Sequence, residues 1–233
     1  MKEVVSEIDC IRVSGDEREK THETIAKEAV MRLFVNDKLV TEFLFSPGFE
    51  EQLVVGYLLS SGLIKSLNDV ENIALQGDTC KTLVSVREDR ISKLQDIGIT
   101  VSHQQLINVR STLLVNQRYH IATRGFHGAI LWELSSGRWF VCEDIGRHNA
   151  IDKVIGYGLK EKYMFSHSMV LLSGRLTSNI VSKCRNSGIP LMASMTVATD
   201  GGIKQASDSN ITIIGSLSEE GFWLYNEGVV KVT

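Results

Sequence analysis

The C-terminal half of the chain alternates short apolar runs with amphipathic segments. Between the runs, apolar positions recur at helical spacing over residues 147–159, 176–187 and 200–208. Short apolar strands that alternate with helices indicate βα units around a largely parallel, buried sheet. The pattern predicts a three-layer α/β domain over residues 116–233, with strands at 127–134, 138–143, 168–173, 189–194 and 211–215, the first two of which form a hairpin, the second in the chain.

The N-terminal half is patterned more weakly and predicts a smaller α+β subdomain over residues 1–115. Two alternating runs, 30–35 and 38–45, flank Asn36-Asp37 and predict a β-hairpin. Ser46 and Pro47 suit the start of a helix that ends near Gly62. We expect the other elements to be an exposed loop at 16–24, a strand at 81–86, a helix at 102–114 and a final hairpin of 222–225 with 229–232.

Composition and charge restrict the class of partner. The 233 residues include 25 Lys and Arg against 28 Asp and Glu, which gives a formal charge of −3. Bulk attraction to nucleic acid or to an anionic membrane is therefore not expected. No run reaches the roughly 18 apolar residues of a membrane span, and the N-terminus lacks the apolar core of a signal peptide, so we expect a cytoplasmic protein.

The four cysteines do not suggest a metal or redox site. Cys10, Cys80, Cys142 and Cys184 lie far apart, and the chain has no CxxC pair. Zinc knuckles and a vicinal dithiol are thereby excluded, and no metal site is predicted. Cys142 alternates with Val141 in a strand, which is typical of a core residue, and it is only a weak candidate nucleophile because its neighbours Glu143 and Asp144 place it near the polar loop that follows.

The densest polar cluster follows the strand at 138–143 and precedes the helix at 147–159. Ligands bind in such crevices of open α/β sheets, and the first N–H groups of a helix attract anions. Arg147 can grip a phosphate, with Lys153 as a further cation if the helix turns it toward the loop. The alternative is a capped, solvated turn. The candidate residues are Glu143, Asp144, Gly146, Arg147, His148 and Asn149.

A second loop of the same layout follows the next strand. Ser173, Gly174 and Arg175 come directly after the apolar run and precede a helix. Adjacent parallel strands would bring the two loops to one edge of the sheet, so that two arginines and two helix starts converge on an anion. The alternative is that Ser173 and Thr177 only cap the helix.

Two further turns are candidates for the same pocket. Thr199 and Asp200 open the third helix, where Asp200 can hold a ribose hydroxyl or a base edge; a capping role explains it equally well. His127, at the entrance to the second hairpin, can carry a proton, although an isolated histidine is more often structural.

Four stretches of this chain resemble, in order, the FdhD family of formate dehydrogenase accessory proteins. The resemblance spans about residues 30–228 and is most specific in the EDIGRHNAIDKV run. The stretches are VNDKLVTEFLFSPGFEEQLVVGYLLSSGLI, EDIGRHNAIDKVIG, LLSGRLTSNIVSKCRNSGIPLMASMTVATDGGI and ITIIGSLSEEGFWLYNEG.

The resemblance implies a cytidine-deaminase-like α/β fold and a role in maturing formate dehydrogenase. Family members carry sulfur from a cysteine desulfurase to the molybdenum cofactor, and they bind its molybdopterin guanine dinucleotide form. The family's cofactor-contacting segment near the C-terminus maps to residues 216–226, where Phe222 and Tyr225 match. A homodimer is expected because two-fold dimers are the commonest assemblies.

The chain departs from the family at the sulfur-carrying residues. The family's carrier cysteines form a CxxC loop before the TRGFH-like segment, yet no cysteine lies between Arg87 and Tyr119. A persulfide needs a thiolate to accept the sulfur. Residues 123–127 and 195–199 also differ from the family's corresponding motifs.

Three hypotheses follow. The first is an FdhD-like accessory protein that binds bis(molybdopterin guanine dinucleotide) molybdenum cofactor, or a GDP-like nucleotide, and presents it to a formate dehydrogenase apo-enzyme without carrying sulfur itself. The second is a working sulfurtransferase that uses Cys142 or Cys80. The third is a scaffold that has lost the ligand and contacts only proteins.

Overall fold

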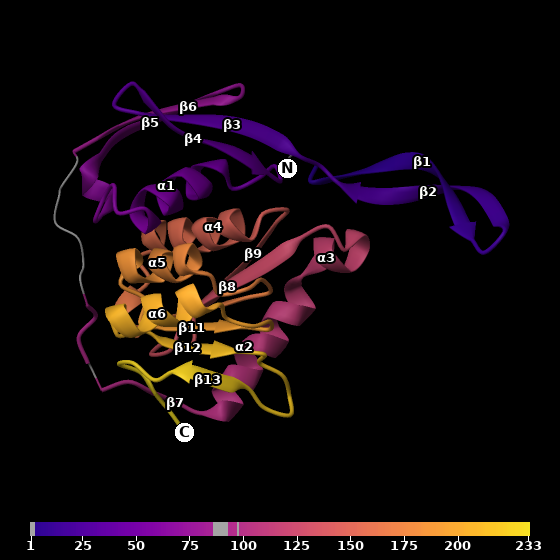
Figure 1. Ribbon diagram of the computed structural model, residues 1–233. Helices are drawn as coiled ribbons and strands as arrows, with labels where there is room; N and C mark the ends of the chain where they lie inside the picture. Colours follow the sequence, from indigo (N-terminus) through magenta and orange to yellow (C-terminus); the bar gives the residue numbers. More distant parts are fainter. Residues whose placement is uncertain (1–2, 86–92, 97) are drawn as a thin grey trace.

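A six-stranded mixed sheet forms the centre of the molecule (Figure 1). The computed structural model describes residues 3–85, 93–96 and 98–233. In spatial order the sheet consists of β13 (Trp223–Asn226), β12 (Thr212–Gly215), β11 (Leu191–Ser194), β10 (Ser168–Leu172), β8 (His127–Glu133) and β9 (Trp139–Asp144).

The predicted hairpin of 127–134 with 138–143 is confirmed as the antiparallel pair β8–β9, but the prediction that the sheet is largely parallel holds only at its centre. Strands β10, β11 and β12 are parallel, because crossover helices connect them. Strands β8, β9 and β13 run antiparallel to their neighbours, since short loops rather than helices join β8 to β9 and β12 to β13.

Helices cover both faces of this sheet and confirm the three-layer α/β fold. One face packs against α4 (Arg147–Lys160), α5 (Ser178–Ser187) and α6 (Asp200–Ser209), and the other against α2 (His103–Asn116). Alternating strand residues serve the two cores: Leu131 of β8 faces the α4 side, and Ile130 faces the α2 side. Helix α2 thus packs on the central sheet, and α3 (Arg118–Thr123) follows it.

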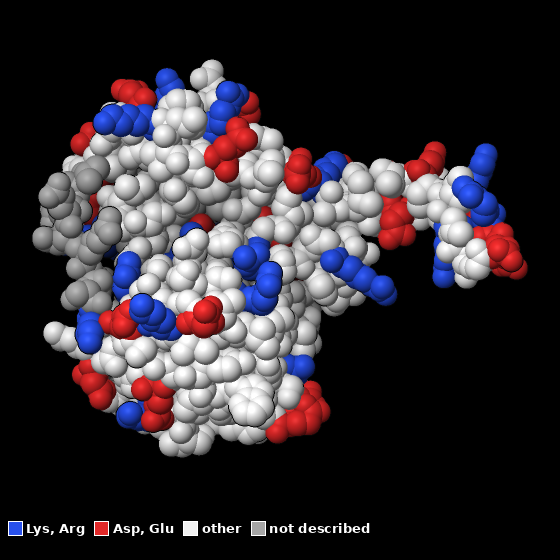
Figure 2. All heavy atoms as spheres, in the orientation of Figure 1, with Lys and Arg blue, Asp and Glu red and all other residues white. Residues whose placement is uncertain are grey.

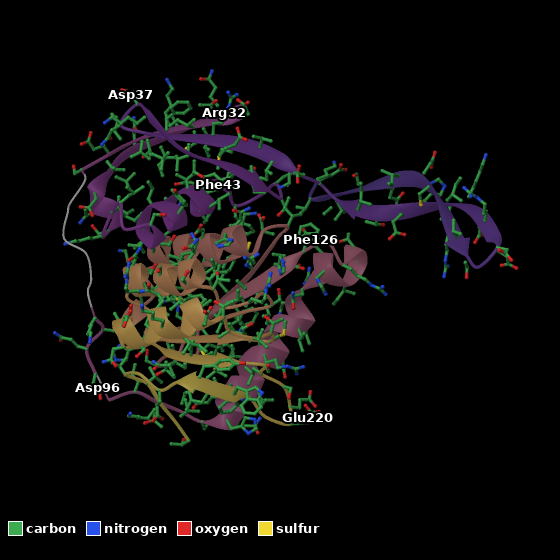
Figure 3. All side chains as sticks on the ribbon, in the orientation of Figure 1. Arg32, Asp37, Phe43, Asp96, Phe126 and Glu220 are labelled. Atoms are coloured by element: carbon green, nitrogen blue, oxygen red, sulfur yellow. The ribbon has the colours of Figure 1, made fainter. Side chains whose placement is uncertain are left out.

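A second sheet and helix lie above this body. The strands, in spatial order, are β4 (Lys38–Phe45), β3 (Ala29–Val35), β6 (Thr79–Val84) and β5 (Val70–Gln76). Asn36 and Asp37 take positive φ in the turn, as the predicted hairpin requires. Phe43 points from this sheet toward α1 (Glu50–Ser60), where its ring meets Tyr57 edge-on (Figure 3). Position 86 of the predicted strand 81–86 lies outside the described residues.

The predicted start of α1 is wrong. Its N-cap is Phe49, which has a left-handed φ of 59° and makes no side-chain cap bond. Ser46 is buried and donates instead to the carboxylate of Asp144 across the subdomain boundary. A tertiary contact therefore displaced the local capping preference.

Residues 17–24 of the predicted exposed loop form part of a strand, and Asp16 lies in the turn before it. Strands β1 (Val5–Ser14) and β2 (Glu17–Ala26) pair antiparallel over their whole length, in a hairpin that extends from the body (Figure 1). Gly15 supplies the positive φ of the turn. The charges that indicated a loop lie on an exposed ribbon.

The predicted C-terminal hairpin is also wrong. Strand β13 pairs with β12, whereas β14 (Lys231–Val232) pairs in parallel with β7 (Thr100–Val101). The hydroxyl of Thr212 donates to the carbonyl of Val230 and accepts from the N–H groups of Gly228 and Val230, which draws this segment toward β12. Short 3₁₀ turns at Leu67–Asp69 and Phe165–His167 complete the fold.

Helices α1 and α4 join the two sheets in an unusually close crossing. A β-carbon on Gly56 would lie 1.8 Å from the carbonyl oxygen of Asp152, and one on Gly156 would lie 1.9 Å from that of Gln52. The buried Asp152 carboxylate also accepts from Lys183 of α5, at 2.7 Å.

Within the described residues, no helix is long and apolar enough to cross a membrane.

Candidate functional site

The two Gly-Arg loops meet at one edge of the central sheet. A hollow of about 380 Å³ is lined by His127, Arg147, Ser173, Gly174, Arg175, Thr196 and Val197. Five of these residues are predicted site residues, and they come from β8, α4 and the loop after β10. Thr196 and Val197 were not predicted. They lie in the loop after β11, which is the next loop along the chain that follows a strand of the sheet, and this position is the signal that could have identified them.

Arg147 occupies its place because residue 174 is glycine. A β-carbon there would lie 2.8 Å from Cδ and 3.1 Å from Cβ of Arg147, so any other residue would push the arginine away. The Nε of Arg147 is buried and has no hydrogen-bond partner among the described residues. Arg175 is exposed beside it. Since buried polar groups are normally paired, the site has a donor available for a ligand acceptor.

His127 and Ser173 form the other wall of the hollow. The Oγ of Ser173 lies 3.2 Å from Nδ1 of His127 and accepts from the N–H of Gly128. Burial, and then the charge of Arg147, lower the pKa of His127, so the imidazole is neutral at pH 7. Burial and Arg147 also lower the pKa of His148, to about 4. Positive charge at the site therefore comes from the arginines.

The acidic residues of the first loop lie behind the hollow and support it. The Asp144 side chain is fully buried, 2.6 Å from Lys153 Nζ, and it accepts from the N–H of Gly146. Asn149 donates to Asp144 and to the carbonyl of Leu44. Lys153 therefore does not turn toward the loop as a further cation, because it is paired inside the protein.

Glu143 performs a similar structural task for α3. Its carboxylate accepts from the backbone N–H groups of Tyr119 and His120. Burial raises the pKa of Glu143, and these two hydrogen bonds oppose that shift.

The third loop lies beside the second, but its candidate residues do not line the hollow. Leu176 and Ala198 form a parallel bridge, and Thr199 N–H donates to the Leu176 carbonyl. The hydroxyl of Thr199 caps α6 by accepting from Gly202 N–H, and Asp200 is exposed.

The two predicted C-terminal aromatic residues are half-buried. Phe222 meets the ring of His103 at 5.4 Å, and Tyr225 packs against Gly215. Both aromatic residues contribute to the packing of β13 and of the loop before it. This loop lies next to the third loop, because Ser216 N–H donates to the Thr196 carbonyl.

Three of the four thiols are buried and protonated. Burial raises the pKa of Cys80 to about 11, and that of Cys142 and of Cys184 to about 12. Cys10, on the projecting hairpin, is partly exposed.

Cys142 lines a second, mostly apolar cavity of about 440 Å³ at the base of the hairpin. Phe49, Arg118, Tyr119 and Glu143 also line it. None of these belongs to the hollow at the arginines, so the two cavities are separate.

Comparison with known proteins identifies the family. The model of the FdhD/NarQ family matches residues 26–97 and 80–229. The chain belongs to the FdhD/NarQ family. Protein FdhD of Methanocaldococcus jannaschii is 31% identical over 208 residues, which cover 88% of each chain. The sulfur carrier protein FdhD of Sulfolobus acidocaldarius is 29% identical over 236 residues, 92% of this chain and 93% of that protein.

A solved structure shares the fold. The crystal structure of a putative formate dehydrogenase accessory protein from Desulfotalea psychrophila matches with a TM-score of 0.86 at 24% identity, and the match covers 96% of this chain and 98% of that one. This chain has no cysteine between Cys80 and Cys142.

Proposed function

We propose that this member of the FdhD/NarQ family binds the guanine dinucleotide form of the molybdenum cofactor, or its GDP portion, in the hollow between the two Gly-Arg loops. Arg147 and Arg175 hold the phosphates, and the neutral His127 with Ser173 forms the facing wall. The observation that carries the proposal is the buried, unpartnered Nε of Arg147, set against Gly174 beside a second arginine.

The cofactor is cargo in this proposal, and the accessory role follows from the family. The protein presents the cofactor to a formate dehydrogenase apo-enzyme, in the cytoplasm, as a homodimer. Thr199, Asp200, Phe222 and Tyr225, which lie on or beside the third loop, contact the guanosine portion.

In our proposal, sulfur transfer does not run through Cys80 or Cys142. Cys80 and Cys142 are buried thiols whose raised pKa keeps them protonated near neutral pH. A protonated thiol neither attacks nor accepts sulfane sulfur efficiently. In our proposal, sulfur from a desulfurase therefore reaches the cofactor without a persulfide on Cys80 or Cys142.

A titration with GDP tests the binding proposal. Arg147→Ala and Arg175→Ala should each weaken binding by about 1.5–3 kcal/mol, roughly 10- to 150-fold, because each removes a charge-assisted contact. Arg185→Ala is the matched control and should bind as the wild type does, since Arg185 contacts Asn186 at the far end of α5. Unchanged affinity in both site variants would refute the proposal.

Two measurements separate the alternatives. A scaffold without a ligand predicts no thermal shift with GDP, whereas a ligand at about 100 times its Kd adds about 2.7 kcal/mol of stability. A sulfurtransferase predicts an added sulfur atom, seen by mass spectrometry after incubation with a desulfurase and cysteine. Loss of that adduct in Cys80→Ala or Cys142→Ala would favour the second hypothesis.

A further inference from the structure

Strand β9 forms an open edge of the central sheet. It pairs only with β8, so one side of its backbone faces away from the sheet (Figure 1). The N–H of Glu133 donates to the carbonyl of Arg138, and from this pair hydrogen-bonded and non-bonded pairs alternate along the antiparallel ladder. The N–H and C=O groups of Val141 therefore point outward, and among the described residues they have no hydrogen-bond partner.

The opposite side of β8 shows the same alternation. The carbonyl of Gly128, which is paired with Glu143, accepts from the N–H of Ser173 of the loop after β10 and not from β9. The backbone of Glu143 consequently faces outward as that of Val141 does, and within the described residues its carbonyl accepts only from the weak S–H donor of Cys142. Two outward residues at a spacing of two are the pattern that an added strand bonds.

The features that normally prevent pairing at a sheet edge are missing from β9. Proteins protect edge strands with lysine, proline or a β-bulge. Residues 139–142 contain neither lysine nor proline, and β9 follows β8 without a shift in register. The side chain at the start of the strand, Trp139, is 43% exposed. The edge is therefore open to pairing with another extended chain.

The apolar cavity of about 440 Å³ lies along this edge. Val141 and Cys142 of β9 line it, together with Phe49 and Tyr119, which are 44% and 37% exposed. Phe49 has a φ of 59°, and a bulky residue in this left-handed region is rare and is found preferentially at binding sites. An apolar side chain on a strand paired with Val141 would fill the cavity.

The surface beside the cavity is basic. Arg118 lines the cavity and is exposed, and it has no acidic partner among the described residues. Figure 2 shows basic side chains that project from the region of α3. The carboxylate of Glu143, which also lines the cavity, already accepts from the N–H groups of Tyr119 and His120. An acidic group on the ligand is therefore complementary to Arg118.

We propose that β9 binds an extended peptide segment of a partner protein as an added strand, with one apolar side chain in the cavity and an acidic side chain against Arg118. Hydrogen bonds to the backbone of Val141 and Glu143 supply affinity, and the cavity supplies specificity. The ligand is a peptide because the open edge and the cavity share these residues of β9. The site is separate from the arginine hollow, so its failure would leave the cofactor proposal standing.

Fluorescence anisotropy with a labelled, end-blocked octapeptide tests the proposal. The probe alternates valine and glutamate, with phenylalanine in place of one central valine. A strand added at an edge donates from every second residue, so two further probes carry N-methyl groups on one or the other alternate set of amides. The unmodified probe should bind saturably, and one methylated probe should bind at least about tenfold more weakly than the other.

Three variants assign the binding to β9 and the cavity. Val141→Pro removes an outward N–H and leaves the bonds to β8 intact, and Phe49→Gly removes a ring from the cavity while glycine suits the backbone φ. Each should weaken binding of the probe about tenfold. Arg118→Glu should do the same, and a probe with lysine in place of glutamate should restore its binding.

Lys204→Glu, a charge reversal on α6, is the matched control and should bind the probe as the wild type does. Thermal unfolding checks that each variant is folded, and the exposed position of Arg118 makes that variant decisive if Val141→Pro does not fold. Three results would overturn the proposal: no saturable binding of the probe to the wild type, equal affinities of the two methylated probes, or unchanged binding in Arg118→Glu.

Discussion

The ammonium group of Lys153 lies 2.6 Å from the carboxylate of Asp144, and both side chains are withdrawn from solvent. The same carboxylate receives two hydrogen bonds from Ser46, and Lys153 donates to the Ser46 carbonyl. The pair therefore links the upper subdomain to the loop that carries Arg147. Desolvation makes the net contribution of a buried pair small, but removing one partner leaves the other charge unpaired.

Asp144→Asn should lower the free energy of unfolding by about 3–5 kcal/mol, because Lys153 would then be a buried charge without a counter-ion. Urea unfolding measures this loss. Glu51→Gln is the control: its pair with Lys160, at 2.7 Å, is partly exposed and should be worth no more than about 1 kcal/mol. Equal losses in the two variants would contradict a special role for the buried pair.

Gly56→Ala should cost about 3 kcal/mol, the upper end of the usual cost of overpacking, because the new methyl group would overlap the Asp152 carbonyl. Gly201→Ala provides a matched helical control. Its β-carbon would meet Ser178 at 3.7 Å, an ordinary contact, and alanine has the better helix propensity. The melting temperature should fall in Gly56→Ala, whereas in Gly201→Ala it should rise or change by a clearly smaller amount.

Stability should fall as the pH drops from about 6.5 toward 4. His148 in the folded protein has a pKa of about 4, whereas the unfolded chain takes up a proton near the ordinary value of 6.5. Over that window the unfolded state binds more protons and is favoured. In a plot of the urea unfolding midpoint against pH, His148→Gln should reduce the slope over this range. His167→Gln should leave the slope as in the wild type. A wild-type slope in His148→Gln would show that the histidine is not responsible.

A single thiol of the native protein should react rapidly with Ellman's reagent. Cys10 is partly exposed, whereas Cys80, Cys142 and Cys184 are buried and have raised pKa values. Cys10→Ser should abolish the rapid phase, and denaturant should release the remaining thiols. A rapid phase that persists in Cys10→Ser would mean that one of the other three thiols is accessible, which would reopen the sulfurtransferase hypothesis.

Much of the central fold and part of the site were readable from the sequence. Strands β8, β9, β10, β11 and β12 and helices α4, α5 and α6 follow from local apolar periodicity, and chain order places the Gly-Arg loops at strand ends. Arg147 and Arg175 could therefore be predicted to meet, but the expected reason, adjacent parallel strands, is wrong. Strands β9 and β10 are not neighbours, and their loops reach the same edge because both strands run antiparallel to β8, which lies between them.

Other features depended on contacts between distant parts of the chain. The sequence pattern alone does not predict that Asp144 forms a buried ion pair with Lys153, or that Ser46 binds Asp144 instead of capping a helix. The β1–β2 hairpin was missed because its strands are exposed on both faces and lack an apolar alternation to read.

By itself, the sequence determined the α/β class, the family and the two arginine loops, since these rest on local periodicity and on specific residue runs. Only the tertiary structure decided which polar residues reach the hollow and which are buried as supports. The physical reason is that a charged side chain becomes a ligand contact or an internal ion pair according to the neighbours that folding brings to it, and those neighbours lie far away in the chain.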